Sequence, residues 1–384
     1  MKAEILSLAD KYLGECVTLR HELHRIPEIA GQEFKTAALL RERLAGLPLT
    51  FRAPFLGTDT VALLNEESGG RNITLRADID ALPIAEETGA AYASTHPGMS
   101  HACGHDGHMA MLYGAIRILC DLKDSLPAGS VRFVFQPGEE SKAMARDLVA
   151  AGVLENPKAD LCAALHGWPN TRYGTIATRA GAMMAAAVHW RLVVTGKGGH
   201  GSMPDKAISP LHSIARITER LRNECPPVCS VCHIDGGFNQ NIIPDTAMME
   251  GTCRSLSDEA GDEIEKVFKT VVDEVCREEG TTYDLDYDKR YPVTLNASEA
   301  AELARAATEK YLGKETFEPM PHSAMSSEDF SYFLRACPGV YCHLGLGDHV
   351  ALHKSKFDFD DRVIRTGMVY FAGLAVEFLA GREG

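Results

Sequence analysis

The segment richest in potential metal ligands lies between His101 and His108. It reads HACGHDGH and contains three histidines, one cysteine and one aspartate. Cys103 and His105 flank a glycine, so both side chains can turn toward one ion. A thiolate and an imidazole suit zinc, cobalt, nickel or iron and also admit manganese. The alternative is a polar loop with a buried structural cysteine, the commoner role of an isolated Cys-x-His pair. Metal binding is favoured only if other ligands lie nearby.

A pair of adjacent carboxylates supplies the second requirement of a hydrolytic site. Glu139 and Glu140 follow the apolar segment VRFVF, within the sequence QPGEE. Most such pairs are solvated turns. A metal-dependent amide hydrolase, however, needs one carboxylate that binds the ion and another that stays free as general acid and base. The pair therefore suits both roles.

Alternating apolar and helical segments predict the fold of the first part of the chain. Short apolar segments that suit strands alternate with segments whose apolar residues recur at helical spacing. This order is typical of a mostly parallel α/β sheet with helices on both faces. The expected strands lie at 61–64, 73–77, 131–135 and 161–166, and the expected helices at 3–24, 33–46, 106–122 and 142–152.

Polar side chains follow three of these strands where the strands end. Asp78 and Asp80 come after ITLRA, the Glu pair comes after VRFVF, and His166 ends LCAALH. Because the carboxyl ends of parallel strands share one edge of a sheet, where ligands bind, we expect these groups to meet. A buried core histidine is the alternative for His166. His349 and His353 lie near the C-terminus, and spacing alone does not decide which of the two completes the site.

A different pattern begins near residue 184. Strand, helix, strand, strand, helix and strand follow one another, which is the order of a ferredoxin-like α+β domain. We therefore predict a domain at 184–294 inserted into a catalytic domain of 1–183 and 295–384. The inserted strands are expected at 187–195, 228–235, 246–254 and 282–288 and its helices at 207–223 and 258–278; later elements are expected at 298–313, 328–335, 339–345 and 361–380.

The inserted segment carries polar residues of its own. GKGGHGS lacks the spacing and the terminal Lys-Ser/Thr of a phosphate-binding loop. Its glycines instead allow His200 to be presented on a tight loop. Asn241 and Arg254 add an amide and a guanidinium, and an arginine suits a substrate carboxylate. A plain surface position is the alternative for Arg254.

Composition argues against several classes of partner. A formal net charge of −14 argues against nucleic acid and anionic membranes. The N-terminus lacks the apolar core of a signal peptide, and the apolar stretch 180–190 is shorter than the about 20 residues that span a bilayer. The eleven cysteines show no disulfide-framework spacing. We therefore expect a cytoplasmic protein with mostly reduced cysteines.

Taken together, the motifs resemble the aminoacylase/carboxypeptidase family of metallopeptidases. Within it, the resemblance is to the amidohydrolases that include hippurate hydrolase and the N-acyl-amino-acid and indole-acetyl-amino-acid hydrolases. LHRIPE, RADIDALPI, HACGHDGH, FQPGEE, GKGGHGSMP, NIIP, SSEDF and LHKSKFDF occur in the family's order over essentially the whole chain. The resemblance implies cleavage of N-acyl amino acids, such as hippurate or N-acetyl amino acids, with one or two divalent ions (Zn, Mn, Co or Ni). It also implies a lid or dimerisation domain and a homodimer or tetramer formed through it.

The resemblance also implies roles for individual residues. Glu139 would be the general base, and His200 would stabilise the oxyanion, in its own or in the partner subunit's site. Asn241 and Arg254 would contact the substrate carboxylate. The implied metal ligands are Cys103, His105, Glu140, His166 and His353.

One departure and three alternatives qualify this interpretation. Asp78-Ile-Asp80 stands where di-zinc carboxypeptidases have His-x-Asp, which favours the cysteine-containing branch and leaves Asp80 to orient a ligand near the catalytic group. The first alternative is a metallo-dipeptidase or carboxypeptidase of the same family. The second is a hydrolase with Cys103 as nucleophile and His105 or His108 as base, which leaves the Glu pair without a function. The third is a non-catalytic metal-binding scaffold.

Overall fold

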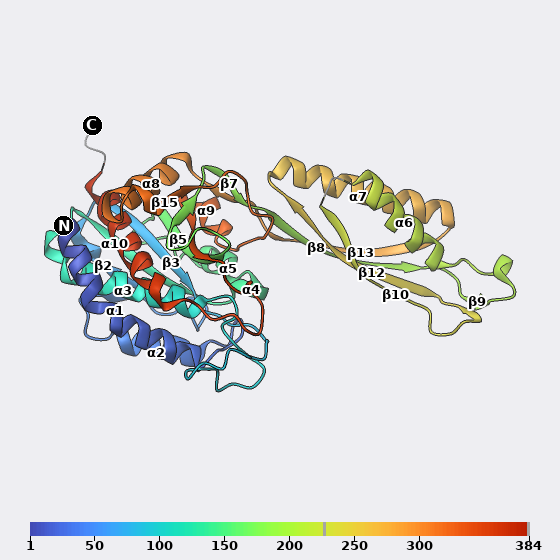
Figure 1. The fold of residues 1–384 in the computed structure, drawn as a ribbon. Helices are drawn as coiled ribbons and strands as arrows, with labels where there is room; N and C mark the ends of the chain where they lie inside the picture. Colours follow the sequence, from blue (N-terminus) through green and yellow to red (C-terminus); the bar gives the residue numbers. More distant parts are fainter. Residues whose placement is uncertain (226–227, 382–384) are drawn as a thin grey trace. The chain divides into compact units, whose positions relative to one another are not determined.

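The computed structural model describes residues 1–225 and 228–381, which form two compact units (Figure 1). The first unit contains Met1–Met183, Leu295–His322 and the chain from Asp329 onward. The second unit contains Met184–Thr294 and Ser323–Glu328. The chain passes between the units near β7 (Gly181–Met184) and β14 (Thr294–Asn296).

Within the described residues, the first unit is built on an eight-stranded sheet in the order β1-β2-β4-β3-β5-β16-β6-β15. The central strands β4, β3, β5 and β16 are parallel, whereas β2 and β6 flank them in antiparallel pairings. This mainly parallel sheet confirms the predicted fold class. The strands are β1 (Thr50–Phe51), β2 (Thr60–Leu64), β3 (Arg71–Asp78), β4 (Gly129–Gln136), β5 (Leu161–Pro169), β6 (Ile176–Thr178), β15 (Phe317–Pro319) and β16 (Gly339–Gly347).

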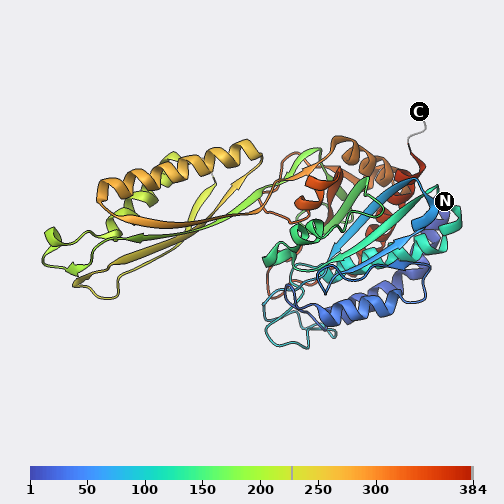
Figure 2. The ribbon, with the colours of Figure 1, turned by 180° about the vertical axis from the view of Figure 1, so that it is seen from behind.

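Helices cover the sheet so fully that β4 is buried along its whole length. Side chains on both faces of the central strands are therefore shielded from water. This explains why the sequences of these strands are almost continuously apolar. Figures 1 and 2 show α1, α3 and α10 packed together beside the sheet. The helices are α1 (Lys2–His24), α2 (Phe34–Leu44), α3 (His105–Asp121), α4 (Glu139–Lys142), α5 (Met144–Ala150), α8 (Ser298–Tyr311), α9 (Ser331–Ala336) and α10 (Ile364–Ala380).

The predicted helix at 142–152 is wrong in its start and in its continuity. The chain turns into α4 at Glu139, directly after β4, and breaks at Ala143 before α5. Ala143 has a left-handed backbone with φ of +51°. The break leaves the Glu pair on a single helical turn at the end of β4.

The C-terminal helix is the most apolar of the long helices of the first unit. The stretch Asp361–Ala380 is long and apolar enough to cross a membrane, but 78% of its most apolar 18 residues is buried inside the unit. It packs against α1, α3 and α8. Its apolar composition therefore reflects a place in the core.

The second unit has the predicted ferredoxin-like order, with sheet order β10-β12-β8-β13. Trp190, Leu192 and Val194 alternate along β8 and are buried against Ile217 and Phe268 of the two helices. His189 and Arg191 point to the other face of β8 and are exposed. The elements are β8 (Ala186–Thr195), β9 (Gly199–His200), α6 (Pro210–Glu224), β10 (Cys229–Gly236), β11 (Ile242–Ile243), β12 (Thr246–Ser255), α7 (Asp258–Glu279) and β13 (Thr282–Tyr291).

Candidate metal centre and catalytic residues

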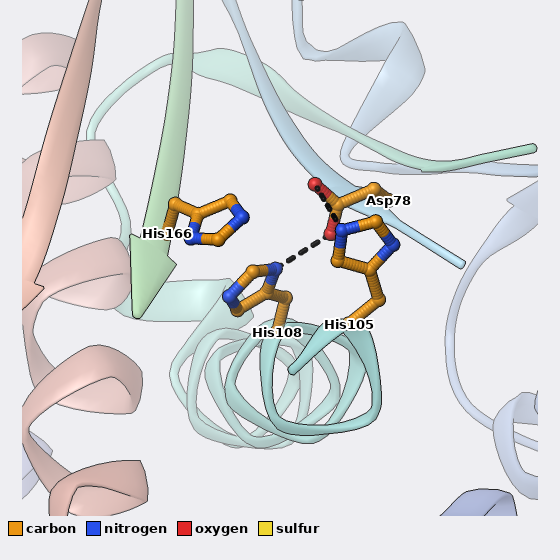
Figure 3. A group of neighbouring side chains, drawn as sticks. All are labelled: Asp78, His105, His108 and His166. Atoms are coloured by element: carbon orange, nitrogen blue, oxygen red, sulfur yellow. Dashed lines mark hydrogen bonds and ion pairs between the residues drawn. The ribbon is translucent and has the colours of Figure 1, made fainter. Parts of the chain in front are cut away.

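The ends of the central strands bring polar residues to one edge of the sheet. Asp78 ends β3 in register with Gln136, which ends β4 and precedes the Glu pair. His166 lies on β5, the neighbour of β3. Figure 3 shows Asp78 and His166 beside His105 and His108, which α3 presents from its first turn. The edge of the sheet and the start of α3 therefore form one polar cluster.

His105 keeps one ring nitrogen available for a cation. Its Nδ1 donates to the backbone carbonyl of Asp80 at 2.8 Å, so Nε2 is the nitrogen that can bind a cation once it loses its proton. Nε2 is buried without a hydrogen-bond partner among the described residues and lies 3.7 Å from Oε1 of Glu140. Burial opposes the charged imidazolium, but Asp78 and the carboxylates of Asp80 and Glu140 outweigh it and raise the pKa of His105 to about 10. The pocket therefore attracts positive charge.

Cys103 and His166 lie next to each other in the same cluster. Sγ of Cys103 lies 3.5 Å from Nε2 of His166, whose Nδ1 donates to the carbonyl of Gly167 at 2.8 Å. Burial lowers the pKa of His166 well below its ordinary value, which keeps the imidazole in the neutral form that binds metals. Burial, followed by Glu140 and then Glu139, raises the pKa of Cys103. A thiolate there requires a neighbouring cation.

The structure distinguishes the two C-terminal histidines. Nε2 of His353 lies 3.3 Å from Oε1 of Glu140. The backbone N–H of His353 donates to the carbonyl of Ala102 at 2.8 Å, and its φ of +61° is in the left-handed region. Strained backbone of this kind persists where the surrounding structure holds it. Both side chains are accessible, that of His353 by 51%, and Nδ1 of His349 lies 3.1 Å from the carbonyl of Val350. His353 is therefore the histidine that joins the cluster.

The donor atoms of this cluster fit a divalent transition-metal ion. Ligand atoms of Cys103, His105 and Glu140 lie within 4.8 Å of one another. His105 and Glu140 contribute buried atoms that lack hydrogen bonds, which is costly unless a cation compensates them. One sulfur, imidazole nitrogens and one carboxylate form a donor set that suits zinc, cobalt, nickel or manganese.

His108 supports the cluster but has no free nitrogen. Ligand atoms of His108 also lie within 4.8 Å of those of Asp78, His105 and His166. However, Nδ1 of His108 donates to Asp78 at 2.6 Å, and its Nε2 accepts the N–H of Gly167 at 2.9 Å. Both ring nitrogens are therefore engaged. The sequence analysis missed this role, although the spacing of His105 and His108 on one helix was a signal for it.

Asp80 holds two of the candidate ligands. Its backbone carbonyl accepts from His105, and its Oδ2 accepts the N–H of Glu140 at 3.0 Å. The residue is buried. Such contacts fix the orientation of ligands before a metal binds.

Glu139 is buried beside the cluster and is positioned by a network that the sequence analysis missed. Its Oε1 accepts the N–H of Asp329 at 3.4 Å. Oδ1 of Asp329 accepts two hydrogen bonds, one from Nη2 of Arg76 and one from Nε2 of Gln136, each at 2.9 Å. It also accepts the N–H of Ala145. Asp329 lies in the motif SSEDF and Arg76 in the motif RADID, so these two motifs were the sign of this network in the sequence.

A second missed network lies behind the metal-binding segment. Arg20 of α1 is fully buried, and its Nε donates to Asp106 at 2.7 Å. His24 contacts the same carboxylate at 2.8 Å, and Arg20 also pairs with Asp358 and Asp361. Arg20 thereby joins the first turn of α3 to the segment that follows His353.

The three remaining predicted residues belong to the second unit. His200 is exposed on β9, and its Nδ1 accepts the N–H of Ser202 at 3.2 Å. The backbone carbonyl of Asn241 accepts the N–H of Gly201, which places Asn241 beside His200. Arg254 is half-buried on β12, where the helices do not cover the sheet. Their contacts with a substrate stay a prediction.

A sheet edge with a buried sulfur–nitrogen–carboxylate cluster, next to a second carboxylate, defines a metal-dependent amidohydrolase. The chain belongs to peptidase family M20/M25/M40, whose sequence model matches residues 74–377. This confirms the resemblance and the predicted class of enzyme.

Individual relatives and solved structures cover nearly the whole chain. The N-acetyl-L-cysteine deacetylase of Bacillus subtilis is 34% identical over 98% of this chain and 91% of its own length. The hippurate hydrolase of Campylobacter jejuni is 31% identical over 98% of both chains. A putative aminohydrolase from methicillin-resistant Staphylococcus aureus aligns with a TM-score of 0.92 at 26% identity, over 99% of this chain and 100% of that one. A Bacillus subtilis dinuclear metal-binding peptidase of the M20 family aligns with a TM-score of 0.85 at 29% identity, over 97% and 99% of the two chains.

Proposed function

We propose that the protein hydrolyses the amide bond of N-acyl amino acids and releases a carboxylate and a free amino acid. The observation that carries this proposal is the buried carboxylate of Glu139 beside the donor cluster. Relatives named as an N-acetyl-L-cysteine deacetylase, a hippurate hydrolase and an N-acetyldiaminopimelate deacetylase support it. In each of the small molecules in these names, an acyl group is attached to the nitrogen of an amino acid.

Five side chains would hold one or two divalent ions, either zinc, manganese, cobalt or nickel. When bound, such an ion lowers the pKa of water and polarises the amide carbonyl. Asp80 contributes by orienting an imidazole and a carboxylate at the same time. The proposed ligands are Cys103, His105, Glu140, His166 and His353.

Glu139 would act as general base and then as general acid. Its carboxylate takes a proton from the water that attacks the amide carbon, and it later gives this proton to the departing amine nitrogen. The hydrogen bond from the backbone of Asp329 holds Oε1 in place for both transfers. The Arg76 and Gln136 contacts hold Asp329 in turn.

His200 would donate a hydrogen bond to the oxyanion, in its own or in the partner subunit's site. Because Nδ1 of His200 accepts from the backbone of Ser202, Nε2 carries the ring proton and is the donor. A donor of this kind typically contributes about 10²–10³ in rate. His200 lies on an exposed loop flanked by glycines, which suits a group that approaches a substrate.

Asn241 and Arg254 would bind the carboxylate of the amino-acid product. Among the described residues, Nη1 of Arg254 contacts Thr252 and the carbonyl of Cys253. The side chain lines a hollow of about 440 Å³ together with His189 and others of the same sheet face. A guanidinium in this setting suits a planar carboxylate.

We further propose a cytoplasmic homodimer or tetramer that assembles through the second unit and binds neither nucleic acid nor membrane. All eleven cysteines are free thiols in the structure, which suits a reducing compartment. The charge of −14 is unfavourable for polyanionic partners.

A panel of N-acyl amino acids tests the proposed reaction. Hippurate, N-acetyl amino acids, N-acetyldiaminopimelate, aminobenzoyl-glutamate and indole-acetyl conjugates are incubated with the Mn²⁺-loaded enzyme, and amine release is measured. We expect turnover of at least one class, and a loss of about 10²–10⁴ in this turnover with Glu139→Gln. Two thermostable carboxypeptidases of Saccharolobus solfataricus, each 34% identical over 94% of this chain, make peptides the second candidate class. Release from blocked peptides alone would contradict the first proposal and favour the second.

A further inference from the structure

Three cysteine thiols meet inside the second unit, far along the chain from the metal-binding segment. Cys225 follows α6, Cys229 begins β10, and Cys253 lies on β12. Cys229 pairs with Cys253 across the two strands, and the thiols of Cys225 and Cys253 are the largest influences on the pKa of Cys229. Cys225 and Cys253 are buried, whereas Cys229 is half-buried and therefore accessible to a small molecule. The proposed hydrolysis uses none of the three.

The strand register places Cys229 directly opposite Cys253. The two residues are partners in the antiparallel pairing of β10 with β12. One step along this pairing, the N–H of Arg254 donates to the carbonyl of Val228 at 2.9 Å. Hydrogen-bonded and non-hydrogen-bonded pairs alternate in an antiparallel ladder, so Cys229 and Cys253 form a non-hydrogen-bonded pair. The Cα atoms of such a pair are about 4.5 Å apart, within the roughly 4.4–6.8 Å that a disulfide spans.

The sulfur of Cys253 also lies among donors that favour a thiolate. Nε1 of Trp190 and Oη of Tyr287 are buried and bond to no nitrogen or oxygen among the described residues. Cys229 lowers the pKa of Cys253 most, burial opposes this, and Tyr287 and Trp190 lower the pKa further, whereas Cys225 and Cys253 raise the pKa of Cys229. A lowered pKa increases the thiolate fraction, and the thiolate is the reactive form in exchange with disulfides.

We propose that Cys229 and Cys253 form a reversible disulfide, so that the second unit carries a thiol redox site of its own. The co-reactant is a small-molecule disulfide. One protein thiolate attacks its S–S bond, forms a mixed disulfide and releases one small thiolate. The other cysteine, once deprotonated, attacks the protein sulfur of the mixed disulfide and releases the second small thiolate. In total, two protein thiols lose two protons and two electrons, and the small disulfide is reduced to two thiols.

The new bond would join β10, which lies at the edge of its sheet, covalently to β12. Cys225 would remain as a third thiol beside the bond, where it can attack Cys229 and exchange partners. A small reducing thiol reverses the reaction by the same steps.

The full-length protein is tested with oxidised glutathione, on a Cys232→Ser background that removes an exposed thiol. Remaining thiols are labelled with a maleimide under denaturing conditions and counted by intact mass. We expect two fewer labels after oxidation, a Cys229–Cys253 cross-link in the peptide map, and full recovery after dithiothreitol. An unchanged label count, cross-links at other cysteines only, or a bound metal that blocks labelling at this site would overturn the proposal.

Matched variants then locate the bond. Cys229→Ser and Cys253→Ser should each abolish the loss of two labels. Cys276→Ser should not, because Cys276 is buried in α7 of the same unit and its thiol contacts Thr281. Thermal melts check that each variant folds. If a serine variant does not fold, the presence or absence of the Cys229–Cys253 cross-link in the peptide map of the parent protein tests the proposal. Retention of the label loss in either of the first two variants would contradict the assigned pair.

Discussion

Nε2 of His105 lies 3.7 Å from Oε1 of Glu140, and both atoms are buried without a hydrogen-bond partner in the part of the chain that the structure describes. Nε2 of His353 lies 3.3 Å from the same oxygen of Glu140, and a neutral His105 beside an ionised Glu140 favours a positive charge between or beside them. A proton on His105 supplies part of this positive charge, as the raised pKa of about 10 for His105 indicates. A divalent cation provides it more fully.

Removal of metal should therefore abolish activity and lower stability. We expect a chelator to eliminate amine release and Mn²⁺, Co²⁺ or Zn²⁺ to restore it. At a metal concentration 100 times the dissociation constant, binding adds about 2.7 kcal/mol to the free energy of unfolding, so the melting temperature should rise with added metal. Undiminished hydrolysis in a chelator-treated, metal-free sample would contradict a metal-dependent site.

The two adjacent carboxylates should respond differently to the same substitution. Glu139→Gln should retain the bound metal and lose about 10²–10⁴ in kcat, because the general base is removed. Glu140→Gln should lose metal, because Oε1 lies among the other donor atoms. Elemental analysis of both variants, alongside steady-state kinetics, provides the comparison. Equal metal loss in the two variants would mean that the assigned division of roles is wrong.

His105 and His108 offer a similar contrast on one helix. His105→Ala should remove the metal. His108→Gln should keep the metal stoichiometry and weaken the affinity about 10–100-fold, because His108 acts through Asp78 and Gly167. Metal titrations of the two apo variants measure this. Complete loss of metal in His108→Gln would identify His108 as a ligand.

Arg20 should be important for stability. Arg20→Met removes the partner of the buried Asp106 carboxylate and should lower the free energy of unfolding by about 3–5 kcal/mol. Arg25→Met, at an exposed arginine near the end of the same helix, should cost less than about 1 kcal/mol. Urea denaturation of both variants tests the difference. Equal effects would show that the buried network contributes no special stability.

The pH dependence of stability should contain a contribution from Glu33. Burial raises the pKa of this carboxyl from 4.5 to about 7. Between these pH values the folded state binds more protons than the unfolded state, so this contribution is complete below about pH 4.5 and is lost as the pH rises through 7. Glu33→Gln keeps an oxygen for the N–H groups of Gly31 and Gly138 and should flatten the curve.

Melting temperatures from pH 4.5 to 8 measure this effect. Glu67→Gln, at an exposed carboxyl of the same unit, is the control and should leave the slope unchanged. A slope in Glu33→Gln that equals that of the parent protein would assign the pH dependence to other groups.

Local patterns were sufficient for most secondary structure. The predicted helix at 258–278 is α7, Asp258–Glu279, because its apolar residues recur at helical spacing, Ser257 caps its start and Gly280 adopts a left-handed backbone after its end. The helix expected at 142–152 was misplaced, because the backbone turns into the left-handed region at Ala143 and no local sequence pattern predicts this turn.

The class of chemistry could be predicted from the amino-acid sequence, because the types of ligand and their places after strands can be read in chain order. Cys103 and the adjacent Glu139 and Glu140 are recognisable in this way from their residue types and neighbours alone. Spacing alone did not decide between His349 and His353, and only the resemblance favoured His353; partners such as Arg76 and Asp329, which are 253 positions apart, required the folded chain. Folding brings such residues together through many weak contacts across the core. The distances between them in the folded protein therefore cannot be predicted from their spacing along the chain.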